Sequence, residues 1–484
     1  MRVSEHFKLG RRQPELDFVD VDVESDLPVF LDPRALLVLP PESEWGAECV
    51  SLVQNFFDTV LSAIRSGDDD RARSLLEQLR EPNETHLGLS KGHSRGRALG
   101  TESAHDVWDA LRQSEAVKSG LLQDLEDTIL MVEGVGSDIV SDITTNILRE
   151  PLVNYTRDVC TAYGIPMKGD VDCGPMWDPT KRDWYSELGD LPVTPFGRLI
   201  LVPKVLVRRQ MHYDPGEYFN HYLLDALAAD ERRARSSLVQ VLKNGNTRVT
   251  KKSLREKYGT GKKVIVEQTR THPEVLERYR GIKAASPPPP LTHAGLADHA
   301  GVPAPDWDAL LDAVTTVPKG GTAATRYHHA VQDLLTALFY PSLAHPVREQ
   351  PLHGGRKRVD IRFTNVARHG FFNWLATHYT APFVYVECKN YTGEVNNPEL
   401  DQLSGRFSKH RGEVGLLVCR RIKNKDLFMQ SCRDTADDGR GFIIALDDND
   451  LRSLVDEARR ADDSDGYRVP LFDLLRERFE ALVM

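Results

Sequence analysis

The chain has 484 residues, with 62 Lys and Arg against 72 Asp and Glu, and a net charge of −10. This length exceeds what one ordinary hydrophobic core needs, so we expect two or three domains. No apolar run approaches membrane-spanning length, the first residues lack the apolar core of a signal peptide, and the six cysteines form no C-x-x-C pair. The composition argues against a membrane protein, a zinc knuckle and a disulfide framework, and favours a soluble cytoplasmic protein.

The N-terminal part begins with a strand pattern and continues with helical patterns. Over residues 17–23 acidic and apolar residues alternate, which is typical of a half-exposed strand, although acids set this closely could also collect a cation. Apolar residues then recur at helical spacing. The expected helices span residues 45–66, 69–80, 104–114 and 119–133. We predict a mainly α-helical N-terminal domain with some strands over residues 1–283.

Two glycine-containing segments of this domain suggest a ligand pocket. Residues 81–100 form a glycine-spaced basic loop whose N–H groups and cations suit phosphate, although its spacing is not that of a Walker A motif. Residues 133–142 place two aspartates one turn apart on a helix. The candidate pocket residues are Lys91, Arg95, Arg97, Asp138 and Asp142. The alternative for the second segment is a structural glycine turn.

The most basic run of the chain spans residues 243–263. Thr250 could cap a short helix that carries Lys251, Lys252, Arg255 and Lys257, which is what an element that grips phosphates needs. Runs of charge are more commonly solvated faces. We therefore treat Lys251 and Lys252 as candidate contacts to nucleic acid beside that simpler interpretation.

A proline run at residues 287–290 marks the clearest boundary, because consecutive prolines favour a stiff, extended polyproline segment. We predict a Pro-rich linker over residues 284–306, with the prolines exposed, and a C-terminal domain over residues 307–484.

Two strands of the C-terminal domain carry the residues with the clearest chemistry. The apolar run at residues 384–391 predicts a buried strand on which Glu387 and Lys389 share one face. Burial of two opposite charges is unfavourable unless they bind something. Upstream, Arg356, Lys357 and Arg358 lead into an alternating strand that contains Asp360.

Asp360 and Glu387 could together supply the oxygen ligands that Mg²⁺ prefers. Lys389 would then orient or deprotonate the attacking water and stabilise the charge on phosphorus oxygens. After this strand, residues 398–407 predict a helix with Gln402 and Arg406 on one face. Residues 414–419 and 441–446 predict short, fully buried strands of the kind found in parallel sheets.

The last third of the chain resembles the PD-(D/E)xK nuclease superfamily. The resemblance lies in the order of the elements: a helix, a hairpin that bears Asp360, a strand that bears Glu387 and Lys389, a second helix and a closing strand. This is the restriction-endonuclease-like fold that includes Mrr-type enzymes, an α/β fold with a mixed central sheet. Val359 stands where the family has Pro. On the helix expected at residues 326–339, many members carry a Glu that completes the metal site. Here His328 or His329 occupies that region, which favours a one-metal site or a His in the outer shell.

The resemblance implies a Mg²⁺-dependent endodeoxyribonuclease, with Mn²⁺ able to substitute and RNA not excluded as substrate. The implied catalytic residues are Asp360, Glu387, Lys389 and Gln402. The candidate contacts to nucleic acid in this domain are Arg356, Lys357, Arg358 and Arg406, a locally basic cleft on an acidic chain.

By analogy of layout, the whole chain resembles prokaryotic restriction and phage-defence effectors. In such an architecture the N-terminal domain would act as a sensor or regulator, and could mediate a homo-oligomer or a protein contact. Two alternatives stay open. One is a non-catalytic nucleic-acid-binding protein that retains the fold, and the other is a nucleotide-sensing or nucleotide-processing protein with its pocket in the N-terminal domain.

Overall fold

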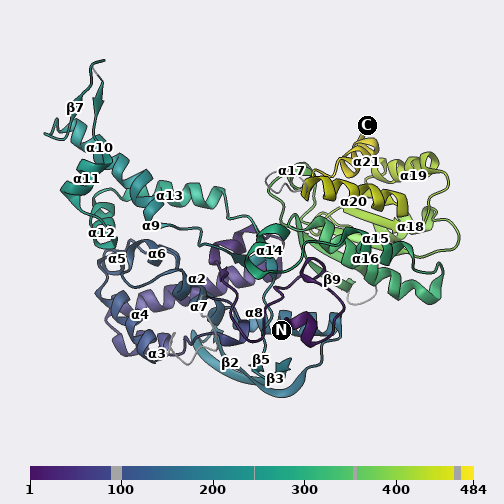
Figure 1. Cartoon of the computed structure of the whole chain (residues 1–484), viewed down its shortest axis with the longest axis horizontal. Coiled ribbons are helices and arrows are strands. Elements are labelled where there is room, and N and C mark those ends of the chain that lie inside the picture. Colours follow the sequence, from purple (N-terminus) through teal and green to yellow (C-terminus); the bar gives the residue numbers. More distant parts are fainter. Residues whose placement is uncertain (89–100, 245, 353–356, 463–469) are drawn as a thin grey trace.

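The computed structural model describes residues 1–88, 101–244, 246–352, 357–462 and 470–484 of the chain. Within its helices and strands, the side chains of residues 101–106, 299–300, 350–352, 357 and 462 are not described. The protein is a mixed α/β protein, with a helical N-terminal part and a five-stranded sheet in the C-terminal part (Figure 1). Among the described residues, no helix combines the length and the apolar character that a membrane span requires.

The N-terminal part consists of helices with several two-stranded sheets between them. The helices are α1 (Val3–His6), α2 (Glu44–Ser66), α3 (Asp69–Leu76), α4 (Thr101–Gln113), α5 (Glu115–Lys118), α6 (Asp127–Met131), α7 (Ser137–Ile147), α8 (Arg149–Tyr163), α9 (Pro215–Tyr218), α10 (Leu224–Arg233), α11 (Lys251–Tyr258), α12 (Lys262–Thr271) and α13 (Pro273–Ala285). The strands are β1 (Phe30–Leu31), β2 (Lys168–Asp178), β3 (Asp183–Leu191), β4 (Val193–Thr194), β5 (Gly197–Arg198), β6 (Val207–Arg208), β7 (Gln240–Val241) and β8 (Thr247–Arg248). Each strand pairs antiparallel with one partner: β1 with β6, β2 with β3, β4 with β5 and β7 with β8.

Local signals explain the longest N-terminal helix. The Ser43 side chain caps α2 by accepting a hydrogen bond from the Gly46 amide, and Gly67 ends it in the left-handed region at φ 77°. The helix expected over residues 119–133 is wrong. The chain leaves helical geometry at Gly120, whose φ of 78° suits glycine, and resumes only with the short α6.

The strand expected over residues 17–23 is also wrong, because this segment makes only isolated bridges. Asp17 and Asp20 are buried, and the partly exposed Asp22 accepts from the N-terminal amine at 3.0 and 2.9 Å. Ser4 donates to Asp20 through its amide and its hydroxyl, at 2.9 and 2.6 Å. Asp17 accepts from the Tyr155 hydroxyl and the His345 amide, both at 2.9 Å. The alternation therefore reflects carboxylates that satisfy internal donors, and neither a half-exposed strand nor a site that collects a cation.

The C-terminal part is built around one mixed sheet in the strand order β13-β12-β11-β10-β9. The strands are β9 (Leu343–Leu352), β10 (Lys357–Asn365), β11 (Phe383–Lys389), β12 (Val414–Cys419) and β13 (Phe442–Leu446). β9, β10 and β11 are antiparallel neighbours, whereas β11, β12 and β13 run parallel. β11 and β12 are buried along their whole length, as expected for apolar strands in the parallel part of a sheet with helices around it. This sheet confirms the α/β organisation expected for this part.

The helices of the C-terminal part flank the sheet (Figure 1). They are α15 (Trp307–Thr315), α16 (Ala324–Phe339), α17 (Gly370–His378), α18 (Asn397–Ser404), α19 (Lys425–Asp437), α20 (Asp448–Asp462) and α21 (Asp473–Val483). Buried apolar side chains form two separate clusters. One runs from Val3 to Tyr279 and adds Val302, Ala344 and Val366, and the other runs from Trp307 to Leu482.

The segment between the two clusters is packed against them and contains a helix, α14 (His293–Ala300). Pro287, Pro288 and Pro290 are buried, so the expectation of an exposed proline run is wrong. Arg208 explains the burial, because its guanidinium donates to the Pro288 carbonyl at 2.8 Å. In polyproline geometry the carbonyls lack internal partners, and a buried one needs such a donor.

The two parts also make direct polar contacts. Arg11 Nε donates to both carboxylate oxygens of Asp333 on α16, at 2.9 and 2.8 Å. Arg348 on β9 donates to the Ala162 carbonyl at the end of α8, and its guanidinium lies over the Tyr163 ring. The N-terminal part is thus bonded to the helix and the edge strand of the C-terminal sheet.

Candidate active site

Asp360 and Glu387 come from neighbouring antiparallel strands, β10 and β11. The register pairs Ile361 with Val386, and one step further along it Asp360 lies opposite Glu387. Beyond this pair the Cys388 amide donates to a side chain instead of a backbone carbonyl of β10, because its acceptor is Asp360 Oδ2 at 2.8 Å. The antiparallel register therefore brings both carboxylates together, on the central strand β11 and on its neighbour β10.

Glu387, Lys389 and Gln402 form a closed hydrogen-bonded group. Lys389 Nζ donates to Glu387 Oε1 and to Gln402 Oε1, both at 2.9 Å. Gln402 Nε2 donates to the same Glu387 oxygen at 2.5 Å. Gln402 reaches the strand because it lies on α18, which packs against β12. A capping box between Asn396 and Glu399 fixes the start of that helix.

The charges of this group influence one another. Burial and the nearby Asp360 carboxylate raise the pKa of Glu387, and Lys389 only partly offsets them. Burial disfavours the ammonium form of Lys389, but the Glu387 carboxylate outweighs burial, so the pKa of Lys389 is raised. Lys389 is therefore held as a cation. This favours a role in which it stabilises negative charge over one in which it removes a proton from water.

One oxygen of Glu387 is available to a ligand. Glu387 Oε2 is buried and has no hydrogen-bond partner, although the side chain is only 2% exposed. A buried carboxylate oxygen without a donor is unfavourable, and two carboxylates on adjacent strands repel each other. A divalent cation would relieve both conditions, and Mg²⁺ commonly binds through one or two carboxylates with water in its other positions. Asp360 and Glu387 thus fit a magnesium ion, while among the described residues no group of three or more His, Cys, Asp and Glu is arranged to hold a metal.

His328 and His329, the two histidines expected near the metal, lie differently. His328 Nε2 is 3.1 Å from the Cys388 carbonyl oxygen and 3.9 Å from Asp360 Oδ2, so this residue of α16 lies beside the site, as an outer-shell group would. His329 is exposed. Desolvation and the nearby cations Arg348 and Arg11 lower its pKa, and both arginines belong to the contact with the N-terminal part.

The candidate contacts to nucleic acid in this domain are only partly described. Arg358 is 68% exposed and pairs with Glu349 at 3.4 Å. Arg406, which follows α18, donates through Nε to the Arg358 carbonyl at 2.7 Å and adds positive charge near Glu387. The structure thus brings these two arginines to the rim of the site. Arg356 and the side chain of Lys357 lie outside the described residues.

Two residues that the sequence analysis missed support the end of β11. Asn390 donates through Nδ2 to the carbonyls of Pro318 and Gly320, both at 2.9 Å. Arg420, at the end of β12, donates to Asn390 Oδ1 at 3.3 Å and pairs with Asp448 at 3.0 Å. Asn390 directly follows Lys389, so a polar residue next to the motif was the available signal. No local signal indicates Arg420, because its partners come from three separate segments.

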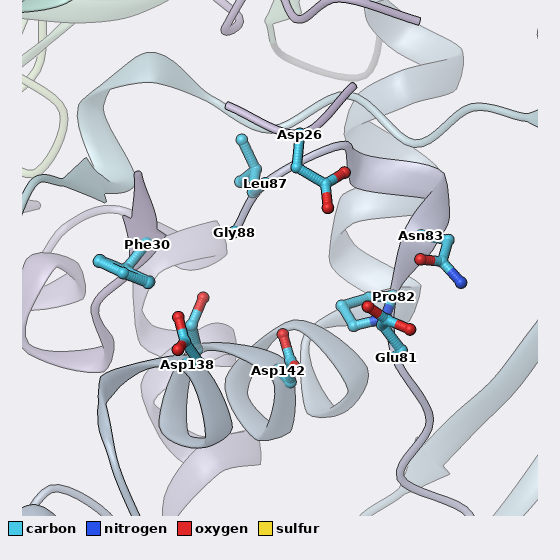
Figure 2. A pocket seen from close by; sticks show the side chains of 10 residues that line it. Asp26, Phe30, Glu81, Pro82, Asn83, Leu87, Gly88, Asp138 and Asp142 are labelled. Atoms are coloured by element: carbon cyan, nitrogen blue, oxygen red, sulfur yellow. The ribbon is translucent and has the colours of Figure 1, made fainter. Parts of the chain in front are cut away.

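Asp138 and Asp142, the candidate pocket residues of the N-terminal domain, do line a cavity of about 230 Å³. Figure 2 shows both side chains directed upward from α7, facing the segments that carry Asp26 and Glu81. Burial, together with Glu81 and Asp138, raises the pKa of Asp142 well above its ordinary value. None of the ten described lining residues is Lys or Arg, so this part of the wall is unsuited to a nucleotide phosphate. Lys91, Arg95 and Arg97 lie outside the described residues.

The basic run of residues 243–263 forms β8, α11 and the start of α12. Thr250 does cap α11, because its hydroxyl accepts from the Ser253 amide at 3.1 Å. Lys251 makes an intramolecular hydrogen bond, because it donates to the Asn220 carbonyl at 2.5 Å. Lys252 is 86% exposed and has only a loose contact of 3.9 Å to Glu256. Of these two candidate contacts, Lys252 is therefore the freer.

Comparison with known proteins reaches the N-terminal part alone. A family model described as a domain of unknown function (DUF8370) matches residues 8–214. The match covers Arg11 and the acidic cavity and ends before the Asp360 site. No curated protein and no solved structure matches the chain.

Proposed function

We propose that this protein is a metal-dependent nuclease that hydrolyses phosphodiester bonds in DNA. The observation that carries the proposal is the buried, unpartnered Glu387 Oε2, in a side chain that Lys389 and Gln402 hold from its other oxygen, beside Asp360 on the next strand. The mixed sheet, with a helix before its hairpin and another after β11, is the arrangement that the resemblance to the PD-(D/E)xK superfamily implies.

Each residue of the site has a distinct role in this proposal. Asp360 and Glu387 would hold Mg²⁺, with Mn²⁺ able to substitute, and the ion would supply the positive charge that activates water and neutralises the phosphate. Lys389, held as a cation, donates hydrogen bonds to phosphate oxygens as negative charge builds on them. Gln402 fixes the orientation of Glu387 and Lys389. His328 contacts the Cys388 carbonyl and steadies the strand end from the other side.

Regulation by the N-terminal part belongs to the same proposal. The ion pair of Arg11 with Asp333 joins that part to α16, the helix that also carries His328. A displacement of the N-terminal part would therefore act on the helix beside the site. This suits a prokaryotic restriction or phage-defence effector, in which a sensor domain restrains a nuclease until a signal arrives.

The proposal is tested by incubating the purified chain with supercoiled plasmid, linear duplex DNA and single-stranded RNA, each in Mg²⁺, in Mn²⁺ and in chelator. We expect cleavage of DNA in both metals and none in chelator. A parallel preparation of the Asp360→Ala variant controls for contaminating nuclease. Binding of DNA without cleavage in either metal would favour the non-catalytic alternative, and cleavage in chelator would overturn the metal-dependent mechanism.

A further inference from the structure

One long stretch of this acidic chain is strongly basic, residues 232–263, which we call the basic arm. It holds eleven Lys and Arg and a single acidic residue, Glu256, so its charge is opposite to the net charge of −10 of the whole chain. The arm comprises the end of α10, the hairpin of β7 and β8, α11 and the start of α12. The hairpin projects from the end of the molecule opposite the C-terminal sheet (Figure 1).

Part of this charge serves the fold. Lys257 pairs with the buried Glu231, and Lys262 donates to the carbonyls of Val132 and Val135 at 2.8 and 2.6 Å, where it bonds the chain just after α6. Burial lowers the pKa of Lys262 to about 8, as expected for an amine used inside the protein. These lysines are therefore structural.

Lys251 and Arg255 are held by Asn220, whereas four other cations face solvent. Lys243 and Arg248 on the hairpin are exposed, as are Lys252 on α11 and Lys263 on α12. α11 and α12 each begin with two lysines and have no acidic residue in the first turn. Positive side chains at a helix N-terminus add to the positive end of the helix dipole, which is unfavourable unless an anion is close. The arm thus presents a field suited to phosphates.

The hairpin also exposes apolar side chains at its end. Val241 is 74% exposed and Leu242 is 40% exposed, although both are large aliphatic residues. Among the described strands, β7 and β8 pair only with each other, so no third strand extends this hairpin. Aliphatic side chains that project beside cations are what proteins insert between base steps from the minor groove. Segments that anchor at a membrane interface are enriched in aromatic residues, and the described hairpin residues 236–244 and 246–250 include none, which favours DNA over an anionic membrane.

We propose that the basic arm binds double-stranded DNA, with Lys243, Arg248, Lys252 and Lys263 on phosphates and Val241 and Leu242 against the minor groove. This deepens the proposed function, because it gives the nuclease a second hold on its substrate at the end of the molecule away from Asp360. The arm would keep the protein on DNA independently of the catalytic metal.

The test measures binding of the full chain to a fluorescent duplex of about 30 base pairs by anisotropy, in chelator and at several salt concentrations. The arm variant is Lys243→Ala with Arg248→Ala and Lys252→Ala, and the tip variant is Val241→Ser with Leu242→Ser. The control is Lys168→Ala with Lys181→Ala, two exposed lysines of the β2–β3 hairpin. Each lost phosphate contact should reduce the slope of log K against log salt by about 0.9.

We expect the arm variant to bind at least tenfold more weakly at low salt, with a slope smaller by about two to three units. The tip variant should bind several-fold more weakly with an unchanged slope, and the control should match the parent chain. Equal affinity and slope in all four proteins would overturn the proposal. So would equal binding of single-stranded DNA, or arm-dependent binding to vesicles of anionic phospholipid without binding to DNA. This binding assay in chelator does not depend on cleavage. A result against DNA binding by the arm can therefore be distinguished from a result against the nuclease site.

Discussion

Lys389 Nζ lies 2.9 Å from Glu387 Oε1 in a pair whose side chains are 11% and 2% exposed. Two buried charges this close depend on each other, and loss of either leaves the other uncompensated. The two residues nevertheless have different chemical roles in our account, because only the Glu387 carboxylate can supply an oxygen ligand to a metal ion.

Replacement of Lys389 should separate these roles. We expect Lys389→Ala to retain binding of Mn²⁺ in calorimetric titration but to cleave DNA about 100-fold to 1,000-fold more slowly, since it removes a cation that acts on the transition state. Glu387→Ala should lose both. If Lys389→Ala and Glu387→Ala lose metal affinity equally, Lys389 is structural and its proposed role is wrong.

Gln402 should act as a positioning residue. It donates to Glu387 and accepts from Lys389, so Gln402→Ala frees both side chains to move. Loss of such supporting groups commonly lowers metal affinity or activity by about 10-fold to 100-fold. We expect a decrease of that size in cleavage and a weaker Mn²⁺ affinity in the same preparation. Asp401→Asn, at the exposed neighbouring position on α18, is the matched control, and equal rates for the two variants would exclude the role.

The contact between the two parts should influence cleavage. If the N-terminal part restrains the nuclease, Arg11→Ala should raise the cleavage rate, and Asp333→Ala should do the same. Their double variant should add little, because both changes remove the same ion pair, in which Arg11 Nε is shared between the two Asp333 oxygens. A coupling energy of about 0.5–3 kcal/mol is typical of residues in such contact. Arg12→Ala is the control. The Arg12 side chain is 56% exposed and makes a loose ion pair of 3.9 Å with Asp306. An unchanged rate in all variants would reject restraint through this contact.

Lys204 should make stability depend on pH. It is 1% exposed, donates to the Pro14 carbonyl at 3.1 Å and lies over the Tyr340 ring, and burial lowers its pKa to about 7. The unfolded chain keeps this proton up to an ordinary lysine pKa of about 10.4, whereas the folded chain releases it above about 7. The unfolded state therefore binds more protons between these values, and stability from this group rises with pH across that window.

Thermal unfolding of the parent chain and of Lys204→Met at pH 7, 8 and 9 measures this effect. We expect Lys204→Met to unfold at a higher temperature than the parent at pH 7, and the difference to shrink as pH rises. If the two unfolding temperatures differ by the same amount at all three pH values, the Lys204 amine is as easily charged in the folded protein as in the unfolded one.

Much of the C-terminal part could be predicted from local patterns. The apolar runs that form β11, β12 and β13 are long enough to indicate buried strands, and period-two alternation puts Glu387 and Lys389 on one face. The helical spacing after Pro398 brought Gln402 to the same region. These predictions depend on spacing within one element, which the sequence contains directly.

The remaining features depend on partners far away in sequence. The acids of residues 17–23 resemble an exposed strand until Ser4, Tyr155 and the His345 amide are seen to donate to them. The buried proline run depends on Arg208, and the engaged Lys251 depends on Asn220. No pattern within a short window contains these pairings, and the same limitation hid the long hairpin of β2 and β3 and the support that Arg420 gives to Asn390.

The most direct test of the metal site compares plasmid cleavage in Mg²⁺ by the parent chain, Asp360→Asn, Glu387→Gln and Asp401→Asn, with circular dichroism to verify that each protein is folded. The two site variants keep the shape of the side chain and remove its charge, whereas Asp401→Asn makes the same change at an exposed carboxylate outside the site. Our account predicts that Asp360→Asn and Glu387→Gln are folded but lose cleavage by at least about 100-fold, and that Asp401→Asn cleaves like the parent chain. Cleavage by folded Asp360→Asn or Glu387→Gln at the parent rate would contradict the assignment of these two carboxylates as the metal ligands of a nuclease.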